Sequence, residues 1–236
     1  SVVECSVMLR SVVLSGMVQV EAASGWAGCI RVPGQTVLPM TFTSCMSIGP
    51  LVPEPDMIVR YRPSRLRALG VAFSALPNFR KESGCQNVEV LSVTSFGSGV
   101  SLNPNVHVSC EVAEGMALWL RNAVQAETVR YFGQRVVKLS NTHGYSCRLR
   151  SGGKVSEHGF ANAIDIGTFH LSDYKTVSVL DHWRTDGTAF GENASRWFSR
   201  VNDSACDYFQ LVLNPRSNKA HENHFHLDQG PWKSCD

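Results

Sequence analysis

The sequence predicts an α+β fold in which a small antiparallel sheet is flanked by helices and stabilised by disulfides. The chain has 236 residues, of which 43% are hydrophobic, and this is enough to build a sizeable core. An apolar stripe at helical spacing lies near its middle, and short runs with strand character follow it, broken by Gly, Asn, Asp and Ser. A helix followed by a cluster of strands is typical of α+β domains.

The expected elements can be placed in chain order. One side of the first helix is apolar, so we expect it to face the core, and that side carries Ala113, Met116, Ala117, Leu120 and Val124. A second helix is expected over 194–201, where three large apolar side chains fall on one side. Strands are expected over 135–140, 145–150, 163–171, 176–181 and 208–214.

Two stretches of the first half resemble each other. Each has a Leu-Arg pair, then Gly-Cys, and then the pattern Pro-x4-Ser-Cys. The two copies end at Cys45 and Cys110. The pattern indicates a degenerate tandem repeat, and chance similarity between two cysteine-bearing β segments is the alternative. A linker is suggested by Pro50, Pro53, Pro55 and Pro63. We therefore predict an N-terminal repeat module over 1–55 and a second domain over 56–236.

The charge balance excludes several classes of partner. Lys and Arg number 22 against 20 Asp and Glu, a formal charge of +2, so no broad field attracts a polyanion and no nucleic-acid partner is expected. No apolar run reaches the about 20 residues that a membrane helix needs, so we expect no membrane span. The sequence starts at Ser1 without a hydrophobic leader, so any export signal is expected to have been removed or to lie outside it.

The cysteines indicate the compartment. There are eight, at wide spacings and without a Cys-x-x-Cys pair: Cys5, Cys29, Cys45, Cys85, Cys110, Cys147, Cys206 and Cys235. Zinc ribbons and thioredoxin-type sites need two thiols on one tight turn, so these cysteines favour a disulfide framework in an oxidising space. We expect a periplasmic or secreted protein, with buried free thiols as the alternative.

Two short segments near the end of the chain carry the chemistry. His224 and His226 form His-x-His, and in an extended strand such residues share a face, about 7 Å apart, so both can reach one ion. His158 and Asp165 can add a further imidazole and a carboxylate if a turn through 159–161 leads into a strand. Hydrolytic zinc sites use such a mixed set of two imidazoles and a carboxylate. If one histidine of the His-x-His pair is a ligand, the other is left for proton transfer.

Other interpretations of these histidines remain open. A structural zinc site or a solvated histidine cluster are the alternatives for the two segments. The free N–H groups of the ligands need acceptors, and Ser156, Asn162 and Asp228 are candidates unless they serve only in turns or caps. Arg148 is either a clamp for a substrate carboxylate or a structural arginine. The isolated histidines are expected at surface or core positions: His107, His143, His170 and His182.

These motifs resemble known families. Ser-x-His-x6-Asp followed by His-x2-His-x-His resembles the lysostaphin, D-Ala-D-Ala peptidase and hedgehog group of zinc enzymes, and the triplet is similar to that of penicillin-insensitive murein DD-endopeptidases. The runs over 145–148, 156–166 and 221–228 resemble more closely the extensin-like C-terminal domain of bacterial proteins. This resemblance covers about residues 65–228.

The resemblance implies a role for each residue. His158, Asp165 and His226 would be the ligands of a Zn²⁺ cofactor, His224 the general base or transition-state stabiliser, and His221 its catalytic or orienting neighbour. The dipeptidase branch of the group has a Glu three residues before its histidine ligand, whereas position 223 here is Asn, so a carboxylate base is not expected unless Glu222 moves in.

The implied function is hydrolysis of peptidoglycan. The resemblance predicts a zinc metallopeptidase, a DD-endopeptidase or carboxypeptidase, that cleaves D-amino-acid-containing peptide cross-links with metal-activated water, so its partners would be peptidoglycan peptides. Because a fold can keep its metal and lose its activity, the alternative is a non-catalytic wall-binding or metal-binding module. A periplasmic copper or zinc carrier that uses the His-x-His strand is a further possibility, since imidazole suits both ions.

Overall fold

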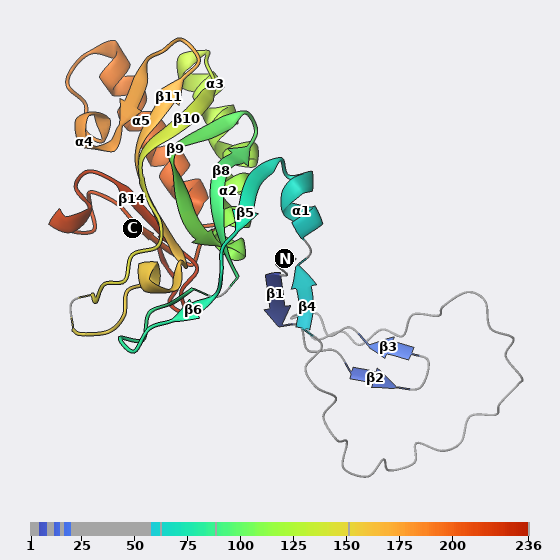
Figure 1. Cartoon of the computed structure of the whole chain (residues 1–236). Coiled ribbons are helices and arrows are strands. Elements are labelled where there is room, and N and C mark those ends of the chain that lie inside the picture. The colour runs from blue at the N-terminus through green and yellow to red at the C-terminus, as the bar shows by residue number, and fades with distance from the viewer. Residues whose placement is uncertain are drawn as a thin grey trace, which may run out of the picture. The chain divides into compact units, whose positions relative to one another are not determined.

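The structure is a computed structural model (Figure 1), and it describes residues 63–87, 89–150 and 152–235 together with the backbone of four short earlier strands. The chain divides into a large compact unit that contains Arg62–Asp236 and a small one over Ser6–Tyr61. The first copy of the predicted repeat, up to Cys45, lies outside the described residues apart from the backbone of those strands. All side chains discussed below belong to the large unit.

The described residues form 15 strands, of which those that follow Arg62 lie in the large unit. The strands are β1 (Cys5–Met8), β2 (Val12–Leu14), β3 (Met17–Gln19), β4 (Ile58–Tyr61), β5 (Val71–Ala75), β6 (Phe79–Arg80), β7 (Gln86–Asn87), β8 (Val90–Gly97), β9 (Val100–Ser109), β10 (Val136–His143), β11 (Ala163–Leu171), β12 (Thr176–Ser178), β13 (Leu211–Leu213), β14 (Phe225–Asp228) and β15 (Ser234–Cys235). Nine of them form one sheet in the order β15-β13-β14-β11-β10-β9-β8-β5, with β12 also paired to β11. The pairs β1-β4, β2-β3 and β6-β7 form separate two-stranded sheets.

The described residues also form eight helical segments. They are α1 (Pro63–Ala68), α2 (Cys110–Trp119), the π-helical segment η1 (Leu120–Val124), α3 (Gln125–Phe132), the 3-10 helix η2 (Glu157–Phe160), α4 (Val179–His182), α5 (Ala189–Ala205) and the 3-10 helix η3 (Lys219–His221). Ser109 caps α2 by accepting a hydrogen bond from Val112 N, and Thr188 caps α5 by accepting one from Gly191 N. Both helices predicted from apolar stripes are confirmed, and both are longer than their stripes.

The predicted small antiparallel sheet is wrong in size and in strand direction. β9 and β10 run parallel, and the continuous helical stretch of α2, η1 and α3 connects them. Parallel neighbours need a crossover of this length, whereas antiparallel neighbours can be joined by a short turn. The central apolar helix is therefore the crossover of a β-α-β unit, and the strands before it belong to the same sheet as those after it.

Three smaller predictions also need correction. The segment 145–150 is not a strand and makes only an isolated bridge between Leu149 and Val155, because Tyr145 N donates to the distant carbonyl of His107. The expected strand 176–181 ends at residue 178, where α4 begins. Pro63 opens α1 rather than lying in a linker, since proline suits the first turn of a helix.

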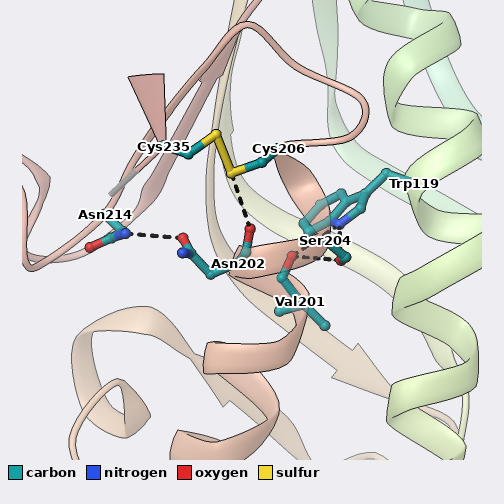
Figure 2. Close-up of a disulfide and its surroundings, with 7 residues drawn as sticks. All are labelled: Trp119, Val201, Asn202, Ser204, Cys206, Asn214 and Cys235. Carbon is teal, nitrogen blue, oxygen red and sulfur yellow. Dashed lines mark hydrogen bonds between the residues drawn. A yellow bond between two sulfur atoms is a disulfide. The ribbon is translucent and has the colours of Figure 1, made fainter. Parts of the chain in front are cut away.

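Aromatic side chains form the centre of the core. α2, α3 and α5 lie together against one face of the sheet (Figure 1). Trp119 of α2 meets Phe169 of β11 and Phe225 of β14 edge to face, with ring centroids 6.3 and 6.4 Å apart. Its indole N–H donates to Val201 O and Ser204 Oγ of α5 (Figure 2). The aromatic core thus joins two helices to the two strands that carry the site described below.

Two disulfides join four of the described cysteines, as the cysteine pattern predicts. Cys85–Cys147 connects two loops, and Cys206–Cys235 connects the end of α5 to β15 (Figure 2). Beside the second disulfide, Asn214 Nδ2 donates to Asn202 Oδ1 at 3.0 Å. The last strand of the sheet is thereby attached covalently to the helix that packs behind it.

We expect removal of the Cys206–Cys235 disulfide to weaken the fold without dismantling the site. The bond closes a loop between residues 29 apart in sequence. Loss of a crosslink of this span costs about 3 kcal/mol of unfolding free energy, so the Cys206→Ser/Cys235→Ser protein should unfold at lower urea concentration. Urea titrations of the oxidised wild type and the variant measure this. A difference below about 1 kcal/mol would show that the bond does not constrain the unfolded chain as proposed.

Candidate metal centre

Strand register places three ionisable side chains in a row. Asp165 of β11 lies directly opposite His226 of β14 on one side and His143 of β10 on the other. Directly opposed residues of antiparallel strands have Cβ atoms about 5 Å apart and project from the same face of the sheet. Pairing of β11 with its two neighbours therefore brings together residues from three separate parts of the chain.

A fourth side chain, that of His158, comes from the turn before β11. Ser156 caps η2, and its Oγ accepts a hydrogen bond from His158 N. The helix ends at Ala161, which has a left-handed conformation with φ 56°, and β11 begins two residues later. The turn predicted to lead from His158 into the strand of Asp165 is therefore present.

Close packing fixes the position of this turn. A Cβ atom at Gly159 would lie 2.5 Å from Val155 Cγ1 and 3.2 Å from Cys85 Sγ, so only glycine allows this approach. The Cys85–Cys147 disulfide thus packs against the residue next to His158. The oxidised cysteines support the site as well as the fold.

Three potential ligand atoms converge in the resulting cluster. His158 Nε2 lies 3.1 Å from Asp165 Oδ1, His226 Nδ1 lies 2.9 Å from the same oxygen, and the two nitrogens are 3.1 Å apart. All three residues are buried, with His158 fully removed from solvent. Buried nitrogen and oxygen lone pairs that lie this close together repel one another unless a hydrogen or a cation lies between them.

In His158 and His226, the outer ring nitrogen, which is the one directed away from Asp165, faces a hydrogen-bond acceptor. His158 Nδ1 donates to Gly144 O at 2.7 Å, and His226 Nε2 donates to Asp228 Oδ2 at 3.0 Å. Because these oxygens accept, each outer nitrogen carries a hydrogen. In the neutral imidazoles, His158 Nε2 and His226 Nδ1 therefore direct lone pairs toward Asp165.

This donor set fits a zinc ion. A carboxylate oxygen and two imidazole lone pairs are ligands that zinc accepts, at about 2.0–2.2 Å, which places neighbouring ligand atoms of a tetrahedron roughly 3.3 Å apart. The separations of 2.9 to 3.1 Å are slightly shorter, so small side-chain movements would suffice. Three protein ligands leave one tetrahedral position for water or substrate.

His143 offers an alternative third ligand. Ligand atoms of His143, His158 and Asp165 lie within 4.8 Å of one another. However, His143 Nδ1 is 3.8 Å from Asp165 Oδ2 and its side chain is 52% exposed, whereas the side chain of His226 is 9% exposed and is oriented by Asp228. We therefore favour His226 as the third ligand and assign His143 to the open edge of the cluster.

The electrostatics of the cluster are those of a site that attracts cations. Burial acts to raise the pKa of Asp165, but hydrogen bonds with His158 and His226 outweigh it and hold this pKa well below its usual range. Burial acts to lower the pKa of His226, but hydrogen bonds to Asp165 and Asp228 outweigh it and raise this pKa to about 9. Without a metal ion, a proton on His226 compensates the buried carboxylates.

His224 and His221 lie beside the ligand cluster. His224 Nδ1 lies 2.7 Å from Asn223 Oδ1 and donates to it, which leaves the Nε2 lone pair 3.7 Å from Asp165 Oδ1. The ring centroid of His221 is 5.2 Å from that of His224. Burial and the positive charge of His226 lower the pKa of His221 to about 4, and burial also lowers that of His224. Both imidazoles are therefore neutral near pH 7.

A hollow opens beside the cluster because β11 has two partners along one edge. β14 pairs with its residues 163–166 and β12 with 168–170, so Gly167 falls at the junction. A Cβ atom there would lie 2.9 Å from Asn141 Cβ and 3.3 Å from Asn223 O, which explains the glycine. The hollow, here called the first hollow, has a volume of about 420 Å³, and its lining includes His143, Asp165, Asp181, Asn223 and His224.

The comparisons identify the family. The family model described as "Extensin-like protein C-terminus" matches residues 63–236, which is most of the chain. The chain belongs to this extensin-like family. Comparison with curated proteins and with solved structures gave no match. Within the described part of this extensin-like protein, no helix is both long and apolar enough to cross a membrane.

The other predicted site residues have distinct positions in the extensin-like domain. Asp228 orients His226, as described above, whereas Ser156 caps η2. Asn162 Nδ2 donates to Glu157 Oε2 rather than to a histidine of the cluster. Arg148 extends to the edge of the cluster, with Nη2 3.8 Å from Asp165 Oδ2, and its side chain is 52% exposed.

Two features of the site differ from what the sequence predicts or carry little signal in it. His143 was expected to be isolated, but strand pairing places it opposite Asp165. The partner of His158 is the backbone oxygen of Gly144, and any residue type can supply such an oxygen. A Cβ atom at Gly144 would collide with His107 O, so the glycine itself was the available signal for a close approach.

Separate removal of His226 and His143 should distinguish the two possible ligand sets. We expect the wild type to bind one zinc ion, His226→Ala to lose at least about 100-fold in affinity, and His143→Ala to stay within about threefold of the wild type. Metal analysis after dialysis and competition with a coloured chelator measure both quantities. If His143→Ala loses zinc while His226→Ala retains it, the ligand assignment is wrong.

Zinc affinity should increase with pH. His226 has a raised pKa of about 9 without metal, so near pH 7 a zinc ion must displace its proton. The logarithm of the affinity should therefore rise by about one per pH unit from about pH 7 and level off above pH 9. Competition titrations at several pH values measure the slope, and calorimetry in two buffers measures the released proton. An affinity that does not change from pH 7 to 9 would contradict this coupling.

The stability of the zinc-free protein should show the opposite trend. Because the pKa of His226 is higher in the folded state, its contribution is fully present below the unfolded value of 6.5 and is lost as the pH rises through about 9. Chelated protein should therefore melt at a lower temperature at pH 9.5 than at pH 6. The His226→Ala protein, which lacks the ring, should show a smaller decrease over the same range.

Proposed function

We propose that this extensin-like protein is a zinc-dependent peptidoglycan hydrolase that cleaves D-amino-acid-containing peptide cross-links. The observation that carries the proposal is the convergence of His158 Nε2, His226 Nδ1 and Asp165 Oδ1 beside an open hollow. The similarity of the His-x2-His-x-His triplet to that of murein DD-endopeptidases supports this substrate class.

The first hollow favours a catalytic over a structural metal. Structural zinc sites are closed by four protein ligands, whereas catalytic sites keep a position open. Here three ligand atoms converge, and Asp165 also lines a hollow of about 420 Å³. A peptide bond in this hollow would lie beside Asp165, one of the residues that would hold the ion.

The protein supplies the proton transfer and the positioning. When bound, zinc lowers the pKa of a water molecule toward about 7 and polarises a carbonyl group. His224 is neutral near pH 7, and its Nε2 faces the centre, so it can accept a proton and later deliver it to the leaving amine. Asn223 holds the ring by accepting from its Nδ1. Arg148 stands where it can bind a substrate carboxylate or the developing oxyanion.

The proposed compartment agrees with this substrate. Disulfides persist in oxidising spaces outside the cytoplasm, and two join described parts of the domain. Peptidoglycan lies in the same space. We therefore propose a periplasmic or secreted site of action.

Cleavage of cross-linked muropeptides tests the proposal. The zinc-loaded protein should convert dimers to monomers, lose this activity with a chelator and regain it with zinc. His224→Ala should lower the turnover rate at least about 100-fold while zinc content stays unchanged, because it removes the proton-transfer group but no ligand. Chromatography of the products and metal analysis of the same samples measure both effects.

His170→Ala is the matched control. This histidine lies on β11 and contacts Ser140, outside the metal cluster, so the variant should keep full turnover. Zinc binding without cleavage at any metal loading would support a non-catalytic binding module instead. Reversible transfer of zinc or copper to an acceptor protein, again without cleavage, would indicate a carrier.

A further inference from the structure

A second hollow, of about 380 Å³, lies outside the metal cluster. It is lined by Leu180, Trp183, Arg184, Pro215, Lys219 and Glu222. Trp183 is 9% exposed and supplies an apolar floor, while Arg184 and Lys219 are exposed. The hollow therefore combines an apolar base with a cationic rim.

The two hollows are adjacent. Leu180 lines both of them and is 63% exposed, so it forms the ridge between them. Glu222 lines the second hollow, and the next two residues, Asn223 and His224, line the first. A chain that occupies the first hollow can therefore cross Leu180 and place its next group in the second.

The charges of the two hollows differ. Arg184 and Lys219 line the second hollow, and within the described residues neither forms an ion pair with a carboxylate. A third cation, Arg216, lies over the Trp183 ring, with Cζ 5.4 Å from its centroid. Glu222 is the acidic residue of this lining. The first hollow is lined instead by the carboxylates Asp165 and Asp181, so an anionic group is favoured in the second.

We propose that the second hollow binds a free carboxylate of the peptide substrate, at a position next to the bond that is cleaved. The proposal rests on the peptidoglycan hydrolase function above, since stem peptides carry free carboxylates and apolar alanine side chains. Arg184 and Lys219 would pair with the carboxylate, and the surface of Leu180 and Trp183 would contact the adjoining apolar part. The second hollow thereby sets the direction in which the peptide lies across the metal cluster.

Binding of two matched peptides tests the proposal without requiring turnover. The probes are a soluble stem tripeptide with free carboxylates and the same tripeptide with every carboxylate amidated. We expect the zinc-loaded protein to bind the free acid about tenfold more tightly by calorimetry. Arg184→Ala and Lys219→Ala should each weaken free-acid binding about threefold to fivefold, and the double variant should remove the preference for it.

Three controls make the experiment specific. Arg121→Ala removes an exposed arginine outside both hollows and should leave binding unchanged. Arg184→Lys keeps the charge and should bind the free acid more tightly than Arg184→Ala does. The preference for the free acid should decrease in high salt, because screening weakens exposed ion pairs.

The outcomes separate this inference from the proposed hydrolase activity. Equal binding of acid and amide by the wild type, a preference that survives in the double variant, or no binding of either peptide would overturn the second hollow as a carboxylate site. If the preference is present but the wild type cleaves no cross-link, the carboxylate site is supported and the hydrolase proposal fails. If cross-links are cleaved and the preference is absent, only the hydrolase proposal is supported.

Discussion

The pairing of β11 with β10 and β14 is the constraint on which the site depends. It places Asp165 between His143 and His226, while the turn before β11 adds His158. A slip of one residue would move Asp165 to the opposite face of the sheet and separate the ligands. The aromatic core and the disulfide beneath Gly159 support this register, so the stability of the fold and the geometry of the site share the same contacts.

The acceptors behind the histidines matter as much as the histidines themselves. Gly144 O and Asp228 take the outer hydrogens, so both inner lone pairs point toward a buried carboxylate. A proton can occupy this centre, as the raised pKa of His226 indicates, and a metal ion competes with it for the same place. The buried carboxylate and the two lone pairs therefore favour a positive charge at this centre, next to a hollow that can admit a substrate.

The sequence predicts the local parts of this arrangement better than the long-range ones. The strand over 163–171 agrees at both ends, because a run with strand character, containing two Ile, a Thr and a Phe, follows a glycine-containing turn. The apolar stripe identifies the central helix but not its role as a parallel crossover, since strand order depends on contacts distant in sequence. For the same reason His143, with no motif around it, could not be placed opposite Asp165, and the backbone acceptor at Gly144 leaves little signal in the sequence.

Locating the ion in the zinc-loaded protein tests the central claim most directly. An anomalous difference map recorded at the zinc absorption edge should show one strong peak, in contact with His158 Nε2, Asp165 Oδ1 and His226 Nδ1 and open toward the first hollow. A peak held by His143 in place of His226, a peak elsewhere in the domain, or no peak at full zinc loading would contradict the account.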